Sequence, residues 1–118
     1  MLHITNRTPH AISLLSEDGS VRLIEPIRPP VRIVSETGLE VDKVQGVSLH
    51  SPSAFGGLSG LPDRRHATVV VVSQLAAMAV AAIHPDRDDV FYPDTSPSGG
   101  AWRDNGRVLA VKRLLRAT

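Results

Sequence analysis

Short stretches of alternating apolar and polar residues recur along the chain, a pattern typical of half-buried β-strands. The expected strands lie at residues 2–5, 11–15, 21–24, 31–34, 39–44, 47–49, 69–72, 90–92, 100–103 and 107–115. Asp18-Gly19 and Asn105-Gly106 predict tight hairpin turns, because these residue types accept the positive φ that such turns require. The pattern therefore predicts antiparallel hairpins at both ends of the chain.

The most hydrophobic segment, residues 69–72, consists of valines, whose stiff branched side chains favour β-structure. A strand that is apolar on both faces is typical of the centre of a sheet that is covered on two sides. Ser73 follows, and its hydroxyl can cap a helix by accepting a bond from a backbone N–H two or three residues later. We expect that helix at residues 74–83, stopped by Pro85.

The expected helix gathers its larger apolar residues near one face, and its alanines elsewhere allow close packing on a sheet. The residues of that face are Leu75, Met78, Ala82 and Ile83. Proline, glycine and serine predict irregular segments at residues 25–30, 51–63 and 93–100. The charged turn at residues 86–89 is expected to be solvated surface, since it lacks the glycine and glutamate spacing of a calcium loop.

These elements predict an α+β fold, a bent antiparallel or mixed sheet of about six or seven strands with one short helix packed on it. Residues 1–118 suffice for a single compact domain with a real core. One helix leaves part of such a sheet uncovered. A homodimer that buries the uncovered part is consistent with this prediction.

Composition narrows the function classes. The chain has no cysteine, which excludes disulfides and thiol chemistry, and its net charge of +1 shows no commitment to nucleic acid or membranes. The longest apolar stretch, residues 69–83, is shorter than the ~20 residues of a membrane span. The start of the chain shows no signal-peptide pattern, so we expect a soluble, cytoplasmic protein. The histidines lack zinc-site spacing, and neither a metal nor a cofactor is expected.

Several short blocks, taken in order, resemble a family of small proteins from bacteria, especially actinobacteria, and from their phages. The blocks are Thr8-Pro9-His10, Val31-Arg32-Ile33-Val34, Gly60-Leu61-Pro62, Val71-Val72-Ser73, Arg87-Asp88-Asp89-Val90, Pro93-Asp94-Thr95 and Arg103-Asp104-Asn105-Gly106. The chain departs from the family pattern at Arg7, where leucine is usual, and at Ser96, where glycine is usual. The resemblance covers nearly the whole chain and implies one compact module, but it brings no established activity.

The expected helix start is the first candidate site. Ser73 and Gln74 would present free N–H groups and a partial positive charge, which favour an anion. Arg64, Arg65 or Arg103 nearby could then help to hold a phosphate. The structural alternative is that Ser73 only caps its helix. The chain has neither a Walker loop nor a Gly-x-Gly-x-x-Gly motif, which argues against a standard nucleotide-hydrolysing site.

Two further clusters are candidates. Thr8 and His10 flank Pro9, and His10 could be a base, a ligand contact or a hydrogen-bonded structural group. In the late loop, Asp94 and Thr95 could form a local turn or bind a ribose hydroxyl. Trp102 or Tyr92 could stack on a ligand, and Arg103 could bind a phosphate. The residues at which we expect a ligand are Thr8, His10, Ser73, Gln74, Asp94, Thr95, Trp102 and Arg103.

These residues favour a non-enzymatic module that binds a small anionic or nucleotide-derived ligand. Sequestration of an immune signal by a phage-borne protein is one version of this hypothesis. A protein–protein adaptor acting through the aromatic late loop is the first alternative. The second is a small enzyme that uses His10 and Asp94 as acid and base, although the sequence shows no paired catalytic constellation.

Overall fold

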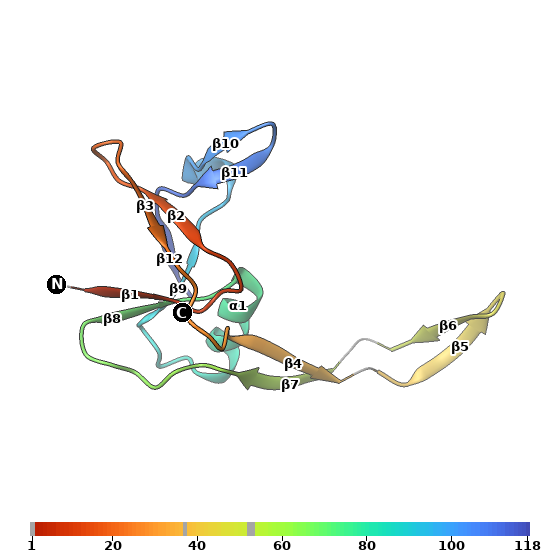
Figure 1. Ribbon diagram of the computed structural model, residues 1–118. Coiled ribbons are helices and arrows are strands. Elements are labelled where there is room, and N and C mark those ends of the chain that lie inside the picture. The colour runs from red at the N-terminus through yellow and green to blue at the C-terminus, as the bar shows by residue number, and fades with distance from the viewer. Residues whose placement is uncertain (1, 37, 52–53) are drawn as a thin grey trace.

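The computed structural model describes residues 2–36, 38–51 and 54–118, and in these residues twelve strands accompany one α-helix and one short 3-10 helix (Figure 1). The centre is a four-stranded sheet. Its strands lie in the order β1 (His3–Asn6), β8 (Thr68–Val71), β9 (Val90–Pro93) and β12 (Leu114–Arg116). β1, β8 and β9 run parallel to one another, and β12 is antiparallel to β9.

The helix α1 (Gln74–Ile83) connects β8 to its parallel neighbour β9, since parallel strands cannot be joined by a tight turn. It begins as predicted, because the Ser73 hydroxyl accepts a hydrogen bond of 3.2 Å from the Ala76 N–H. The predicted end at residue 83 is also confirmed. The residues that α1 buries are Ala76, Ala77, Ala79 and Val80, whereas the larger Leu75 and Met78 are 67% and 63% exposed. The helix thus packs through its small side chains and leaves its larger ones outside.

The core lies between α1 and the sheet. Its buried residues are Val31, Val70, Val72, Ala76, Ala77, Val80 and Val90. Val71 points to the opposite face of the sheet by strand alternation and is buried too. The prediction of a central strand covered on both faces is therefore confirmed for β8.

Two hairpins stand beside one another on one side of this sheet (Figure 1). The first pairs β2 (Ile12–Leu15) with β3 (Val21–Ile24), and the second pairs β10 (Trp102–Asp104) with β11 (Arg107–Ala110). Backbone bonds between Leu15 and Val111 and between Val111 and Ser13 hold the two hairpins together. Both predicted turns are present, and Asn105 and Gly106 adopt positive φ of 51° and 76°. The 3-10 helix η1 (Pro97–Gly99) lies in the loop before β10.

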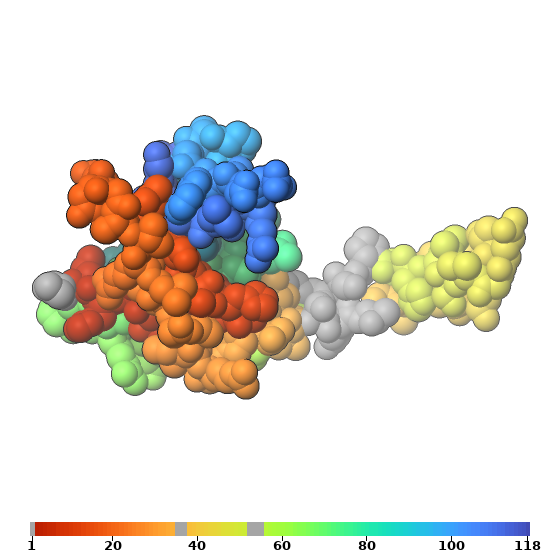
Figure 2. All heavy atoms as spheres, turned by 45° about the horizontal axis from the view of Figure 1, so that its top comes forward, coloured from red at the N-terminus to blue at the C-terminus, as the bar shows by residue number. Residues whose placement is uncertain are grey.

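A long projection leaves the sheet on another side (Figures 1 and 2). Its base is the ribbon of β4 (Arg32–Glu36) and β7 (Ala54–Ser59), and its outer part is the hairpin of β5 (Glu40–Val44) and β6 (Val47–His50). The projection makes the molecule elongated, with principal extents of 56 × 38 × 24 Å.

The α+β class agrees with this structure, but the prediction of a single sheet of six or seven strands is wrong. The strands form the four-stranded sheet and four separate two-stranded ribbons. Residues 54–59 of the predicted loop form β7, because β4 supplies a partner distant in the sequence. Pro52 and Ser53 of that loop lie outside the described residues. The predicted strand at 107–115 is two strands, since β11 pairs with β10 and β12 pairs with β9. None of the helices in the described residues has the length and apolarity to cross a membrane.

Candidate functional site

The carboxyl ends of β1, β8 and β9 meet at one edge of the sheet, which we call the carboxyl edge. Most of the predicted ligand-binding residues follow these ends: Thr8 and His10 after β1, Ser73 and Gln74 after β8, and Asp94 and Thr95 after β9. Trp102 and Arg103 lie on β10. Parallel strand order thus brings three segments that are far apart in sequence to one edge. Their hydrogen bonds show what they do there.

Asn6 organises the first of these segments. It is fully buried, and its Nδ2 donates to the carbonyl oxygens of His10 at 2.8 Å and Ile24 at 3.0 Å. Its Oδ1 accepts from the backbone N–H of Thr8 at 3.0 Å and from the Thr8 hydroxyl at 2.7 Å. The same hydroxyl lies 2.8 Å from the His10 carbonyl oxygen, a second acceptor within reach of its single proton. Thr8 and the backbone of His10 therefore serve a local turn, while the His10 ring is exposed.

Asp94 organises the late loop in a similar way. It is 2% exposed, and its Oδ1 accepts from the N–H and the hydroxyl of Ser96 at 3.0 and 2.6 Å. Its Oδ2 accepts from Nε of Arg113 at 2.6 Å. A Cβ on Gly99 would lie 2.5 Å from the carboxylate carbon, so only glycine fits at that position. The Ser96 hydroxyl and then the Arg113 guanidinium lower the pKa of Asp94 to about 2. The carboxylate is thus ionised and engaged on both oxygens at neutral pH.

Of the remaining predicted residues, some are hydrogen-bonded within the chain and others are exposed. The Ser73 hydroxyl accepts the hydrogen bond that caps the helix, and Gln74 is exposed beside it. The Arg103 guanidinium donates to the carbonyl oxygens of Thr95 and Gly106, which ties the late loop to the β10–β11 hairpin. Trp102 is 52% exposed. Tyr92, by contrast, packs against the core and is less available to stack on a ligand.

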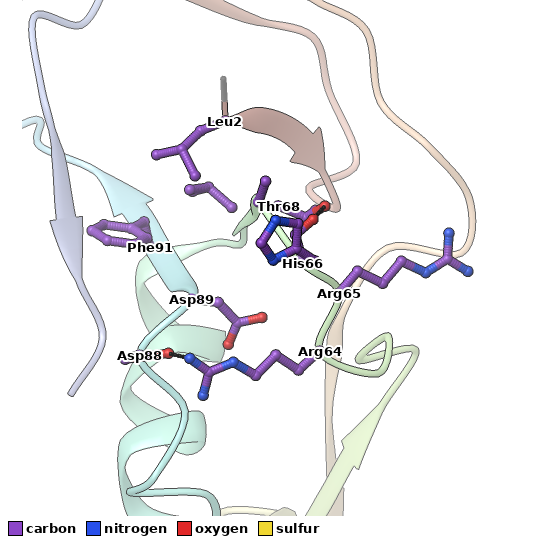
Figure 3. A pocket seen from close by; sticks show the side chains of 10 residues that line it. Leu2, Arg64, Arg65, His66, Thr68, Asp88, Asp89 and Phe91 are labelled. Atoms are coloured by element: carbon purple, nitrogen blue, oxygen red, sulfur yellow. Dashed lines mark hydrogen bonds and ion pairs between the residues drawn. The ribbon is translucent and has the colours of Figure 1, made fainter.

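A cavity of about 470 Å³, which we call the His66 pocket, opens at the amino end of β8, beside β9 (Figure 3). Its lining residues are Leu2, Arg64, Arg65, His66, Ala67, Thr68, Val69, Asp88, Asp89 and Phe91. Figure 3 shows Leu2 and Phe91 on one side of the cavity, His66 facing them, and Arg64 reaching across to Asp88. Arg64 and Arg65 precede β8, so the prediction that they lie near the helix start after β8 is wrong.

Two Arg–Asp pairs border the His66 pocket, and they differ in exposure. Arg64 and Asp88 form an ion pair whose side chains are 56% and 55% exposed. Arg87 binds Asp89 with two parallel bonds, from Nε to Oδ1 at 2.8 Å and from Nη2 to Oδ2 at 3.0 Å, and its Nη2 also donates to the Pro62 carbonyl.

These side chains of Arg87 and Asp89 are only 14% and 7% exposed. The prediction that residues 86–89 are all solvated is therefore wrong for this pair. The Arg87 hydrogen bonds lower the pKa of Asp89, and the same bonds raise the pKa of Arg87.

The wall of the His66 pocket also contains an unusual backbone conformation. Ala67 has a φ of 53°, in the left-handed region that residues other than glycine seldom adopt. Such strain costs on the order of 1–3 kcal/mol and is concentrated at functional sites in proteins. The Ala67 carbonyl accepts a bond of 2.7 Å from the His3 N–H, which holds the turn against β1. This hydrogen bond to β1 helps to hold the backbone of Ala67 in its left-handed conformation.

Comparisons of the chain with protein-family profiles, with curated proteins and with solved structures gave no match. Within the described residues, no cluster of three or more histidine and carboxylate side chains could hold a metal ion. Function is therefore inferred from the chemistry of the two sheet edges alone. Sequence reasoning missed Asn6, Arg113 and the His66 pocket. The run Arg64-Arg65-His66, directly before the valine strand, was the available signal for the pocket.

Proposed function

We propose that the protein is a non-enzymatic binding protein and that a small anionic, nucleotide-derived molecule occupies the His66 pocket. The observation that carries this proposal is the composition of one cavity, which combines a flat aromatic side chain, a histidine and a guanidinium group (Figure 3). At about 470 Å³ it falls within the range of roughly 300–1,000 Å³ typical of small-molecule sites.

Phe91 and His66 suit the base of such a ligand. Val90 is buried toward α1, so strand alternation turns Phe91 to the opposite face of the sheet, where the pocket lies. An aromatic ring at a cavity wall offers a stacking surface that is not specific for one base. His66 stands across the cavity from it and adds a ring nitrogen for hydrogen bonding (Figure 3).

Arg64 suits the anionic part. Its present partner is Asp88, and both side chains are more than half exposed. Exposed ion pairs contribute only about 0–1 kcal/mol, so a ligand can replace Asp88 at little cost. A guanidinium binds a phosphate through two parallel hydrogen bonds, which are stronger than those between neutral groups. Asp89 repels an anion less than a free carboxylate would, because Arg87 neutralises it.

The described residues favour binding over catalysis. The enzyme hypothesis needs Asp94 as an acid or base near neutral pH, but its pKa of about 2 and its bonds to Ser96 and Arg113 keep it ionised and occupied. Asp88 and Asp89 are each paired with an arginine. Holding a signalling nucleotide away from its receptor requires binding alone, which fits the sequestration version of this function.

Calorimetry against ADP-ribose, cyclic mononucleotides and cyclic dinucleotides tests the proposal. We expect at least one of these compounds to bind, with an affinity that falls tenfold or more in Arg64→Gln and His66→Ala and that weakens as salt is added. His10→Ala and Gln74→Ala, at the carboxyl edge, are the matched controls and should bind normally. Loss of binding in the controls alone would move the site to the carboxyl edge, and the absence of binding to every compound would refute the proposal.

A further inference from the structure

The outer hairpin of the projection, β5 and β6, is here called the arm. Every residue of its two strands is exposed, and Figures 1 and 2 show it extending away from the rest of the molecule. An isolated two-stranded hairpin is at best marginally stable in water. Among the described residues, the arm therefore lacks the packing that usually stabilises such a hairpin.

The arm is amphipathic. The register pairs Val44 with Val47 and Asp42 with Leu49, so three aliphatic side chains share one face with Asp42, which lies farther from the turn than Val44. The intervening pair, Lys43 and Ser48, occupies the other face. A hairpin selected only to remain in water does not require three aliphatic residues on one face. Their presence indicates that this face is covered by another surface.

The body of the molecule carries an apolar groove that matches the arm in character. The groove lies between β4 and the outer face of α1, has a volume of about 270 Å³ and is lined by Ile33, Leu75, Met78, Ala79 and Ala82. None of these lining residues is charged. The large side chains of α1 are thus exposed in this chain, although their apolar character favours burial.

We propose that the arm of one copy docks in the helix groove of a second copy, and that the two copies exchange arms about a two-fold axis. Each chain has one uncovered apolar projection and one uncovered apolar groove, and two-fold symmetry would cover both at once. The groove carries no charge that would attract a nucleic acid or another highly charged partner.

The two docked faces supply about a third to two thirds of the apolar area that a standard homodimer interface buries. Five large aliphatic side chains lie on the arm face or in the groove, each 41–67% exposed: Val44, Val47, Leu49, Leu75 and Met78. At about 60–120 Å² for each fully buried side chain, they represent roughly 170–340 Å² per copy. A standard interface buries about 800 Å² per partner, of which about 65% is apolar in homodimers. This proposal is independent of the ligand proposal, because the groove shares no residue with the His66 pocket.

Cysteine crosslinking between two differently labelled copies tests the contact, since the chain has no cysteine of its own. Val47→Cys and Leu75→Cys are prepared separately, mixed and oxidised. We expect a covalent dimer from the mixture, and far less from Ser48→Cys mixed with Leu75→Cys, because Ser48 lies on the polar face of the arm. Equal crosslinking of both mixtures, or none, would overturn the proposal. So would a disulfide closed within one chain carrying both Val47→Cys and Leu75→Cys.

Native mass spectrometry supplies a second measurement. The wild-type protein should be dimeric at micromolar concentration, and the double variant Val47→Lys, Leu49→Lys should dimerise at least tenfold more weakly, while Ser48→Lys should not. Met78→Glu, in the groove, should also be monomeric. Mixing the arm variant with the groove variant restores one intact contact, so heterodimers should outnumber both homodimers. A wild-type monomer, or a dimer indifferent to these changes, would contradict the exchange of arms.

Discussion

The two edges of the four-stranded sheet differ in how many of their polar groups remain available. At the carboxyl edge, Asn6 and Asp94 are buried and their side-chain oxygens and nitrogens are engaged by the chain itself. At the amino edge, the His66 pocket is open, and its Arg64–Asp88 pair is more than half exposed. A dense polar cluster in a sequence therefore need not be a binding site. Groups that are already paired organise the chain, and groups that can exchange partners are free to bind a ligand.

The carboxyl edge has a reason to pair Asn6 and Asp94 within the chain, because the segments after β1 and after β9 leave the sheet there without continuing as a strand or a helix. Backbone bonds from Ile27 to Asn6 and from Val31 to Arg7 tie the proline-rich segment to the end of β1. Buried polar groups without partners would cost about 1–3 kcal/mol each. Asn6 and Asp94 supply the partners that the missing strand or helix would otherwise provide.

The largest effect is expected at Asn6. Asn6→Ala removes the partners of the Ile24 carbonyl and the Thr8 N–H in a buried position, and it should lower the free energy of unfolding by about 3 kcal/mol. Thr8→Val keeps the shape of Thr8, removes only its hydroxyl and should cost about 1 kcal/mol. Urea unfolding measures both values. An Asn6→Ala protein as stable as Thr8→Val would show that Asn6 does not organise this edge.

The dependence of the free energy of unfolding on acidic pH tests whether the ionised Asp94 carboxylate stabilises the fold. Its pKa falls from 3.8 to about 2 on folding, so its stabilising contribution is complete above pH 4 and is lost as the pH falls through the range down to 2. Asp94→Asn cannot ionise, and because its amide has a single oxygen, its NH2 group faces either Ser96 or Arg113, both of which are donors. The variant should be less stable than wild type at pH 7, and the two proteins should converge near pH 2. Unfolding curves that stay parallel across this range would contradict the assignment.

The smallest effect on stability is expected at Arg64, and Arg87 provides the comparison. Arg64→Gln breaks an exposed pair with Asp88 and should change the free energy of unfolding by less than about 0.5 kcal/mol. Arg87→Gln leaves Asp89 and the Pro62 carbonyl without their partner and should cost about 2 kcal/mol. Thermal unfolding of the two variants suffices. A large loss of stability in Arg64→Gln would mean that this arginine is structural and not available to a ligand.

The elements that could be predicted from the sequence are those set by neighbouring residues. The Ser73 cap and Pro85 define α1, and Asp18-Gly19 and Asn105-Gly106 define two hairpins. β7 could not be predicted, because its Gly-rich sequence forms a strand only through pairing with β4. The break between β11 and β12 has a similar origin, since β11 pairs with its neighbour β10 whereas β12 pairs with the more distant β9.

The candidate site was predictable in part. Parallel strand order does bring the segments of Thr8, Ser73 and Asp94 to one edge, and each of these side chains bonds to a residue two or three positions away. The bond from Arg113 to Asp94 could not be predicted, because it depends on the antiparallel pairing of β12 with β9. Neither the His66 pocket nor the choice of which face of α1 is buried follows from helical or strand periodicity.

By itself, the sequence determined the local structure of this protein: a valine strand, a capped helix, and tight turns at residues with the required φ. Only the tertiary structure decided which polar side chains are buried in hydrogen bonds within the chain and which remain accessible to a ligand. A hydrogen bond within a few residues is encoded by their chemistry, whereas burial depends on every segment that packs around a residue. For this reason Asp94 is a fixed structural carboxylate, and Arg64, in a less conspicuous part of the sequence, lies at the edge of an open pocket.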